Sequence, residues 1–84
     1  MYTLHITPSA EKDLRRLPRP TLERLNAKIL ALRHDPRPSG VRKLSGKLEG
    51  WRIRVGDYRI LYQIDDAAQT VTVARVKHRR EAYR

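Results

Sequence analysis

The strongest constraint on the fold is the alternating stretch of residues 51–64. Apolar side chains alternate with arginines in its first half, which is the period of a strand with one buried face. Gly56-Asp57 then interrupts the alternation, and glycine at the first central position favours a two-residue type II′ turn. The segment therefore predicts an antiparallel hairpin whose second strand covers residues 58–64.

The register of this hairpin brings like charges together. With only Gly56 and Asp57 in the turn, Arg54 lies directly opposite Arg59, and Arg52 follows on the same face. Directly opposed like charges are unfavourable in a sheet, whereas guanidinium groups bind phosphate oxygens through paired hydrogen bonds. The pattern favours an anion bound between the arginines. A solvated outer face of a half-buried sheet is the plainer alternative.

Two neighbouring features favour the anion site. Leu61 and either Val71 or Val73 are expected on the arginine face, which would make it a partly apolar, covered groove. The last part of the chain adds polar groups of the kinds that contact phosphates and bases. These groups are Arg75, Lys77, Arg79, Arg80 and Tyr83.

The remaining segments predict helices and further strands. Residues 2–6 alternate like a short strand, and a helix follows and ends at the Pro18-Arg19-Pro20 break. A second helix over about residues 21–33 has one apolar stripe, and residues 70–77 form a further strand. The stripe consists of Leu22, Leu25, Ile29 and Leu32.

This order of elements predicts a single α+β domain over residues 1–84. We expect an antiparallel sheet of about four strands with the N-terminal helical hairpin packed on one face. An 84-residue chain is too short for a second domain. The other face of the sheet is then available for function.

Charge and composition narrow the function classes. The net charge is +10, and 14 of the 19 basic residues are arginine, so a polyanionic partner is expected. No cysteine is present, which excludes disulfides, thiolate zinc sites and a cysteine nucleophile. The chain has no apolar run of membrane-spanning length and no signal-peptide pattern, so we expect a cytoplasmic protein without a membrane partner.

Metal and cofactor chemistry have little support in the sequence. Asp65-Asp66 is typical of a solvated hairpin turn, and His5, His34 and His78 are scattered. We therefore expect no metal and no cofactor. A cationic groove with a tyrosine and a histidine near its end can stabilise a pentavalent phosphate and transfer protons, as cleavage of RNA by its own 2′-OH requires.

Three motifs resemble the RelE branch of the RelE/ParE toxin superfamily. They are Leu44-Ser45-Gly46, the Trp51–Tyr62 hairpin, and the Val76–Arg84 end of the chain. The resemblance covers nearly the whole chain and implies a RelE-like fold. It also implies a toxin of a toxin–antitoxin pair that cleaves messenger RNA in the ribosomal A site, without metal.

The resemblance implies which residues surround the scissile phosphate. The expected catalytic residues are Arg52, Arg54, Arg59, Arg79 and Tyr83. Known bacterial relatives carry lysines where Arg52 and Arg54 stand, and guanidinium is a poor general base because its pKa is above 12. The group that removes the 2′-OH proton is therefore left open, and Arg80 is an alternative to Arg79. Either Arg79 or His78 is expected to protonate the 5′-leaving oxygen.

These considerations give one main hypothesis and two alternatives. The main hypothesis is a ribosome-dependent endoribonuclease toxin whose partners are the ribosome, messenger and ribosomal RNA, and a RelB-like antitoxin. Further RNA contacts are expected from Lys43, Lys47, Arg75, Lys77, His78 and Arg80. The alternatives are a ParE-like toxin that inhibits DNA gyrase without nuclease activity, and a nonspecific nucleic-acid-binding module or decayed toxin.

Overall fold

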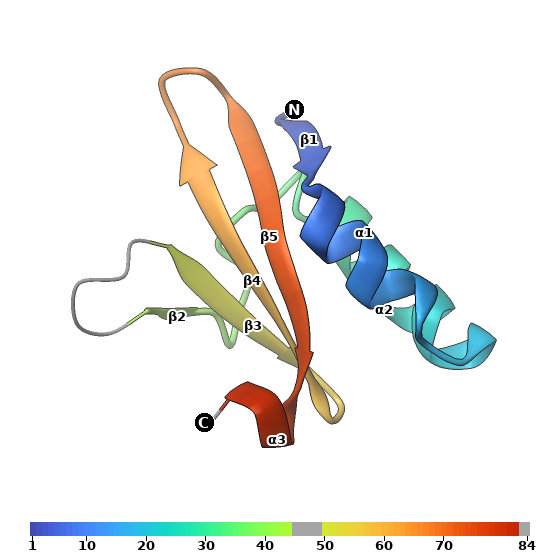
Figure 1. Cartoon of the computed structure of the whole chain (residues 1–84). Coiled ribbons are helices and arrows are strands. Elements are labelled where there is room, and N and C mark those ends of the chain that lie inside the picture. Colours follow the sequence, from blue (N-terminus) through green and yellow to red (C-terminus); the bar gives the residue numbers. More distant parts are fainter. Residues whose placement is uncertain (45–49, 83–84) are drawn as a thin grey trace.

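The computed structural model describes residues 1–44 and 50–82 and contains two helices on one side of a sheet (Figure 1). A third, short helix follows the last strand. The elements are β1 (Thr3–Ile6), α1 (Pro8–Arg15), α2 (Arg19–Ala31), β2 (Arg42–Lys43), β3 (Trp51–Val55), β4 (Tyr58–Asp65), β5 (Thr70–His78) and α3 (Arg79–Ala82). The predicted α+β class and helical hairpin are confirmed.

Within the described residues the sheet has five strands in the order β1-β5-β4-β3-β2, one more than the approximate count expected. β1 pairs in parallel with β5, while the other pairs are antiparallel. A parallel pair requires a long crossover connection. Here the long connection from β1 to β5 begins with the helical hairpin, and β1 lies at the edge of the sheet beside β5.

The helical hairpin begins and turns at local sequence signals. The Thr7 hydroxyl accepts a hydrogen bond from the Ala10 N–H at 3.1 Å, which caps α1 as expected for threonine before a helix. α2 begins at Arg19, earlier than the expected Thr21. Pro20 does not break the helix because the first turn tolerates a residue without an N–H.

The central hairpin has the predicted register. Arg54 pairs with Arg59, Ile53 with Ile60 and Trp51 with Tyr62. Gly56 has a φ of 60°, a left-handed value that a glycine adopts at little cost and that the first central position of a type II′ turn requires. The sequence therefore determines both the turn and the opposition of the two arginines.

One expectation about the sheet faces is wrong. Val71 and Val73 are fully buried on the helix side, where they pair with Ile64 and Tyr62. The β4–β5 register shifts between Leu61 and Tyr62, and this irregularity reverses the alternation along β5. Leu61 lies on the arginine face as expected, and neither Val71 nor Val73 joins it there.

The core between the helices and the sheet is aliphatic apart from one tyrosine. The Tyr62 hydroxyl donates a 2.6 Å hydrogen bond to the Pro36 carbonyl, so its polar atom is satisfied inside the core. The buried core residues are Ala10, Leu14, Leu25, Ile29, Leu32, Ile53, Val55, Ile60, Tyr62, Val71, Val73 and Val76. No helix among the described residues is long and apolar enough to cross a membrane.

Candidate functional site

Three cations form a row across three neighbouring strands on the face opposite the helices. Arg54 of β3 pairs with Arg59 of β4, and Arg59 pairs in turn with Lys77 of β5. Arg59 lies in the middle and is only 7% exposed, whereas Arg54 is exposed. A mostly buried guanidinium between two other cations is an arrangement that a bound anion would stabilise.

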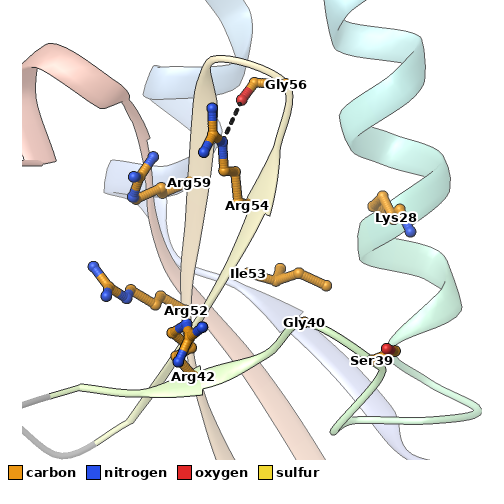
Figure 2. Close-up of a pocket in the computed structure, with 9 residues that line it drawn as sticks. All are labelled: Lys28, Ser39, Gly40, Arg42, Arg52, Ile53, Arg54, Gly56 and Arg59. Carbon is orange, nitrogen blue, oxygen red and sulfur yellow. Dashed lines mark hydrogen bonds between the residues drawn. The ribbon is translucent and has the colours of Figure 1, made fainter.

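A second row of basic residues lies beside the first. Arg42 of β2 pairs with Arg52 of β3, Arg52 with Leu61, and Leu61 with Arg75. Arg52 and Arg59 point to the same side of the sheet in Figure 2. The predicted grouping of Arg52, Arg54 and Arg59 on one face is therefore present in the structure.

A groove of about 670 Å³ runs past these arginines and around the edge of β3. Figure 2 shows α2 with Lys28 on one side and the sheet on the other, with the Ile53 side chain pointing toward the helix between them. Arg54 Nε donates a 3.2 Å hydrogen bond to the Gly56 carbonyl, which holds the guanidinium near the hairpin tip. The lining residues are Lys28, Ser39, Gly40, Arg42, Arg52, Ile53, Arg54, Gly56 and Arg59.

Arg79 is anchored to the hairpin tip. Its backbone N–H donates a 2.6 Å hydrogen bond to the Asp57 carbonyl, and its guanidinium lies 3.8 Å from Asp57 Oδ1. Asp57 follows Gly56, to which Arg54 is bound, so Arg79 lies at the same end of the sheet as Arg54 and Arg59. Arg80 is exposed, and its backbone N–H donates to His78 Nδ1 at 3.2 Å.

His78 lies on the other side of the sheet from the cation row. It pairs with Tyr58, which shares its face with Ile60 of the core. The two rings are in edge contact, with centroids 5.2 Å apart and planes at 87°. The structure therefore separates His78 from Arg54 and Arg59, although the three are close in register.

Arg75 is held by the first helix. Asp13 of α1 accepts hydrogen bonds from Arg75 Nε at 2.8 Å and from its terminal nitrogen at 3.1 Å. Burial alone would raise the pKa of the Asp13 carboxyl, but the hydrogen bonds from Arg75 and the Val76 N–H outweigh it and lower that pKa. Arg75 thus has a structural partner and lies outside the groove.

The remaining predicted residues are peripheral or outside the described part. Lys43 is exposed on β2, opposite Trp51. Lys47 and Tyr83 lie outside the described residues. Their expected roles in RNA binding and catalysis stay predictions.

The opposite end of the sheet has a different character. Asp66 accepts hydrogen bonds from Arg37 at 2.9 Å and from the Tyr2 hydroxyl at 2.6 Å, and these bonds lower the pKa of the Asp66 carboxyl. Asp66 is thus part of an ion-paired network in addition to a turn. Within residues 1–44 and 50–82, no group of three or more histidine or acidic residues could hold a metal ion.

The protein family of the chain is established by its match to a family model. Residues 4–83 match the model described as the ParE toxin of the type II toxin–antitoxin system parDE. The chain belongs to the RelE/ParE toxin superfamily. It is 38% identical to toxin RelG of Mycobacterium tuberculosis over 99% of this chain and 97% of that one. It is 35% identical to toxin RelE of the same organism over 99% of this chain and 87% of that one.

Solved structures agree with the superfamily assignment. The chain matches the RelBE2 toxin–antitoxin complex of M. tuberculosis with a TM-score of 0.82 and 35% identity, over 92% of this chain and 96% of that one. The RelE-RelB complex of Pyrococcus horikoshii gives 0.82 and 29%, over 93% and 94%. The isolated Escherichia coli RelE toxin gives 0.78 and 27%, over 99% and 96%. The RelE-like fold expected of this toxin is confirmed.

Some residues that line the groove of this toxin were not predicted from the sequence. Lys28 comes from α2, Ser39 and Gly40 come from the connection after that helix, and Arg42 comes from β2. Lys28 is four residues after Arg24, and both are off the apolar stripe, so helical spacing could have placed them together on one side. Its position beside the edge of β3 depends on tertiary packing, which no local pattern predicts.

Proposed function

We propose that this toxin is a ribosome-dependent endoribonuclease that cleaves messenger RNA in the ribosomal A site without a metal. The observation that carries the proposal is the row Arg54–Arg59–Lys77 with its buried central guanidinium. The relatives named RelG and RelE add support for this branch of the superfamily. Membership of the family already makes the chain a toxin of a toxin–antitoxin system.

The proposed chemistry uses the substrate's own 2′-OH as the nucleophile. The 2′-oxygen attacks the adjacent phosphorus, the bond from phosphorus to the 5′-oxygen breaks, and a 2′,3′-cyclic phosphate and a 5′-hydroxyl result. Arg54 and Arg59 stabilise the negative charge that develops on the pentavalent phosphate, because preorganised cationic donors act most strongly where charge develops. Arg79, anchored at Asp57 of the hairpin tip, is the proposed donor to the leaving oxygen, with Arg80 as its alternative.

The proposal assigns the arginines to charge stabilisation and not to proton abstraction. A guanidinium with a pKa above 12 is a poor base, so Arg52 and Arg54 cannot replace a lysine in that role. Tyr83 stays the proposed group for orienting the nucleotide or assisting its 2′-OH. His78 is left out of the site because it lies on the helix side of the sheet beside Tyr58.

The ribosome is proposed as the element that orients the RNA. A chain of 84 residues offers few groups to hold a flexible strand, and positioning contributes much of the rate available to such a site. Free RNA should therefore be cut poorly. The proposed antitoxin is RelB-like, as in the solved relatives, and carries an acidic segment because a net charge of +10 favours a complementary partner.

The family model favours a second candidate function, since it is described as a ParE toxin. A ParE-like toxin would inhibit DNA gyrase by protein contact and leave RNA intact. Primer extension on messenger RNA in a translating extract, with and without the protein, tests both candidates. Breaks confined to translated codons are the expected result, whereas intact RNA with gyrase-linked DNA breaks would establish the second candidate.

A further inference from the structure

The groove continues past the cation row and around the free edge of β3 to the second helix. In the part of the chain that the structure describes, β2 pairs only with Trp51 and Arg52, so no described strand lies beside the edge of β3 from Ile53 to Val55. Lys28 lines the groove from α2, and Arg42 lines it from β2. The two sides of the edge therefore carry charge of the same sign (Figure 2).

The helix side carries a second basic residue. Arg24 and Lys28 are exposed and one helical turn apart on α2, a spacing at which like charges destabilise a helix by a few tenths of a kcal/mol. Both terminal guanidinium nitrogens of Arg24 lie 3.5 Å from the position that a Cβ on Gly56 would occupy. Arg24 therefore extends the helix side of the groove to the hairpin tip.

These cations are available to a ligand. Among the described residues, the ion pairs use Arg15, Arg19, Arg37, Arg75 and Arg79. None of those pairs involves Arg24, Lys28 or Arg42. Among the described residues, no acidic side chain lines the groove, and Ile53 is the one large apolar side chain that does. A surface of this kind lacks the apolar anchors that hold an amphipathic helix and suits a chain of regularly spaced phosphates.

We propose that the groove between α2 and the edge of β3 is a second RNA-backbone site, in which Arg24, Lys28 and Arg42 hold phosphates away from the scissile one. The inference rests on the proposed function, which supplies RNA as the ligand. A single strand bound in the cation row would continue around the β3 edge past Gly56. In this account Arg24 and Lys28 position the RNA and take no part in the chemistry.

The test compares the double variant Arg24→Ala/Lys28→Ala with Lys12→Ala/Arg16→Ala. The control removes the same two charges from exposed positions in and just after α1. Equilibrium binding to purified ribosomes and to a short single-stranded RNA is measured over a range of salt concentrations. The site variant should bind the ribosome, the single-stranded RNA or both on the order of ten-fold more weakly. It should also lose about 2 from the salt slope, because each phosphate contact contributes about 1.

The two arms identify the source of the phosphates. Weaker binding to both the ribosome and the single-stranded RNA assigns the groove to the messenger strand. Weaker binding to ribosomes alone assigns it to ribosomal RNA.

Equal affinity and salt slope for the site variant and the control would overturn the proposal. So would unchanged RNA binding with weakened antitoxin binding, which would make the groove a protein-docking surface. Thermal unfolding of both variants shows that the fold is intact. If the parent binds RNA but never cleaves it, the proposed nuclease function fails while the binding comparison still tests the groove.

Discussion

Asp13 and Arg75 join the first helix to the last strand through paired hydrogen bonds of 2.8 and 3.1 Å. Asp13 also accepts a 2.9 Å hydrogen bond from the Val76 backbone N–H. β1 pairs with β5 only from Thr70 to Val73, so beyond that point no strand of the described residues lies beside this edge of β5. One carboxylate thus satisfies a backbone group of the edge and holds α1 against it.

Removing this carboxylate should destabilise the fold. The Asp13 side chain is 12% exposed and that of Arg75 is 42% exposed, so Arg75 can be rehydrated in part while the Val76 N–H loses its partner. We expect Asp13→Ala to lower the free energy of unfolding by about 1–3 kcal/mol. Denaturant unfolding measures the change. Glu23→Ala, which breaks an exposed pair with Arg19, is the control and should cost under about 0.5 kcal/mol. Equal losses in the two variants would contradict this role for Asp13.

Stability should fall in acid because of the same residue. The folded-state pKa of Asp13 is lowered, so its stabilising effect is fully present above the unfolded pKa of about 3.9. It is lost as the pH falls through the lowered folded-state pKa. Unfolding midpoints between pH 7 and pH 2.5 should decline less steeply for Asp13→Asn than for the parent. Parallel declines would show that other groups control acid unfolding.

The buried tyrosine allows a prediction at high pH. Burial raises the pKa of Tyr62 to about 12, so the folded state favours the neutral phenol. Stability should therefore fall as the pH rises above about 10, the unfolded-state value. Tyr62→Phe should remove this alkaline loss and lower stability at pH 7 by about 1–2 kcal/mol, because the Pro36 carbonyl loses its donor. If the variant loses stability at high pH as the parent does, Tyr62 is not the responsible group.

Local patterns predicted the hairpin because its turn and its register depend on residues that are close in the sequence. The glycine-aspartate turn determined the register, and the register placed Arg54 opposite Arg59. The shift between Leu61 and Tyr62 could not be predicted in this way. An irregularity in one strand leaves no mark in a periodic pattern, so Val71 and Val73 were assigned to the wrong face.

Pairing between residues that are far apart in the sequence could not be predicted from local patterns either. The parallel pairing of β1 with β5 depends on how the helical hairpin crosses the sheet. The bond between Asp13 and Arg75 joins residues 62 positions apart, and only the packing of α1 brings them together. For the same reason the sequence suggested an RNA-binding role for Arg75 but did not reveal its partner.

The antitoxin interaction should depend on ionic strength. The net charge of +10 and the exposed arginines of the groove favour an acidic partner segment. The antitoxin should therefore associate more slowly and bind more weakly as salt is raised, because at 0.1 M salt the attraction between exposed charges is largely screened beyond about 10 Å. Stopped-flow association at several salt concentrations measures this. Rates that do not change with salt would contradict the electrostatic part of the interaction.

The cation row is tested most directly by single-turnover cleavage of ribosome-bound messenger RNA with Arg59→Ala. The variant loses the central guanidinium of the row, so we predict a rate lower by about 10²–10³, the usual effect of removing one transition-state donor. Arg16→Ala removes the same charge from an exposed position and should cleave at the parental rate. If the Arg59 variant unfolds in thermal scans, Arg54→Ala provides a second test at an exposed position of the row. Cleavage at the parental rate by folded Arg59→Ala would contradict the proposed site.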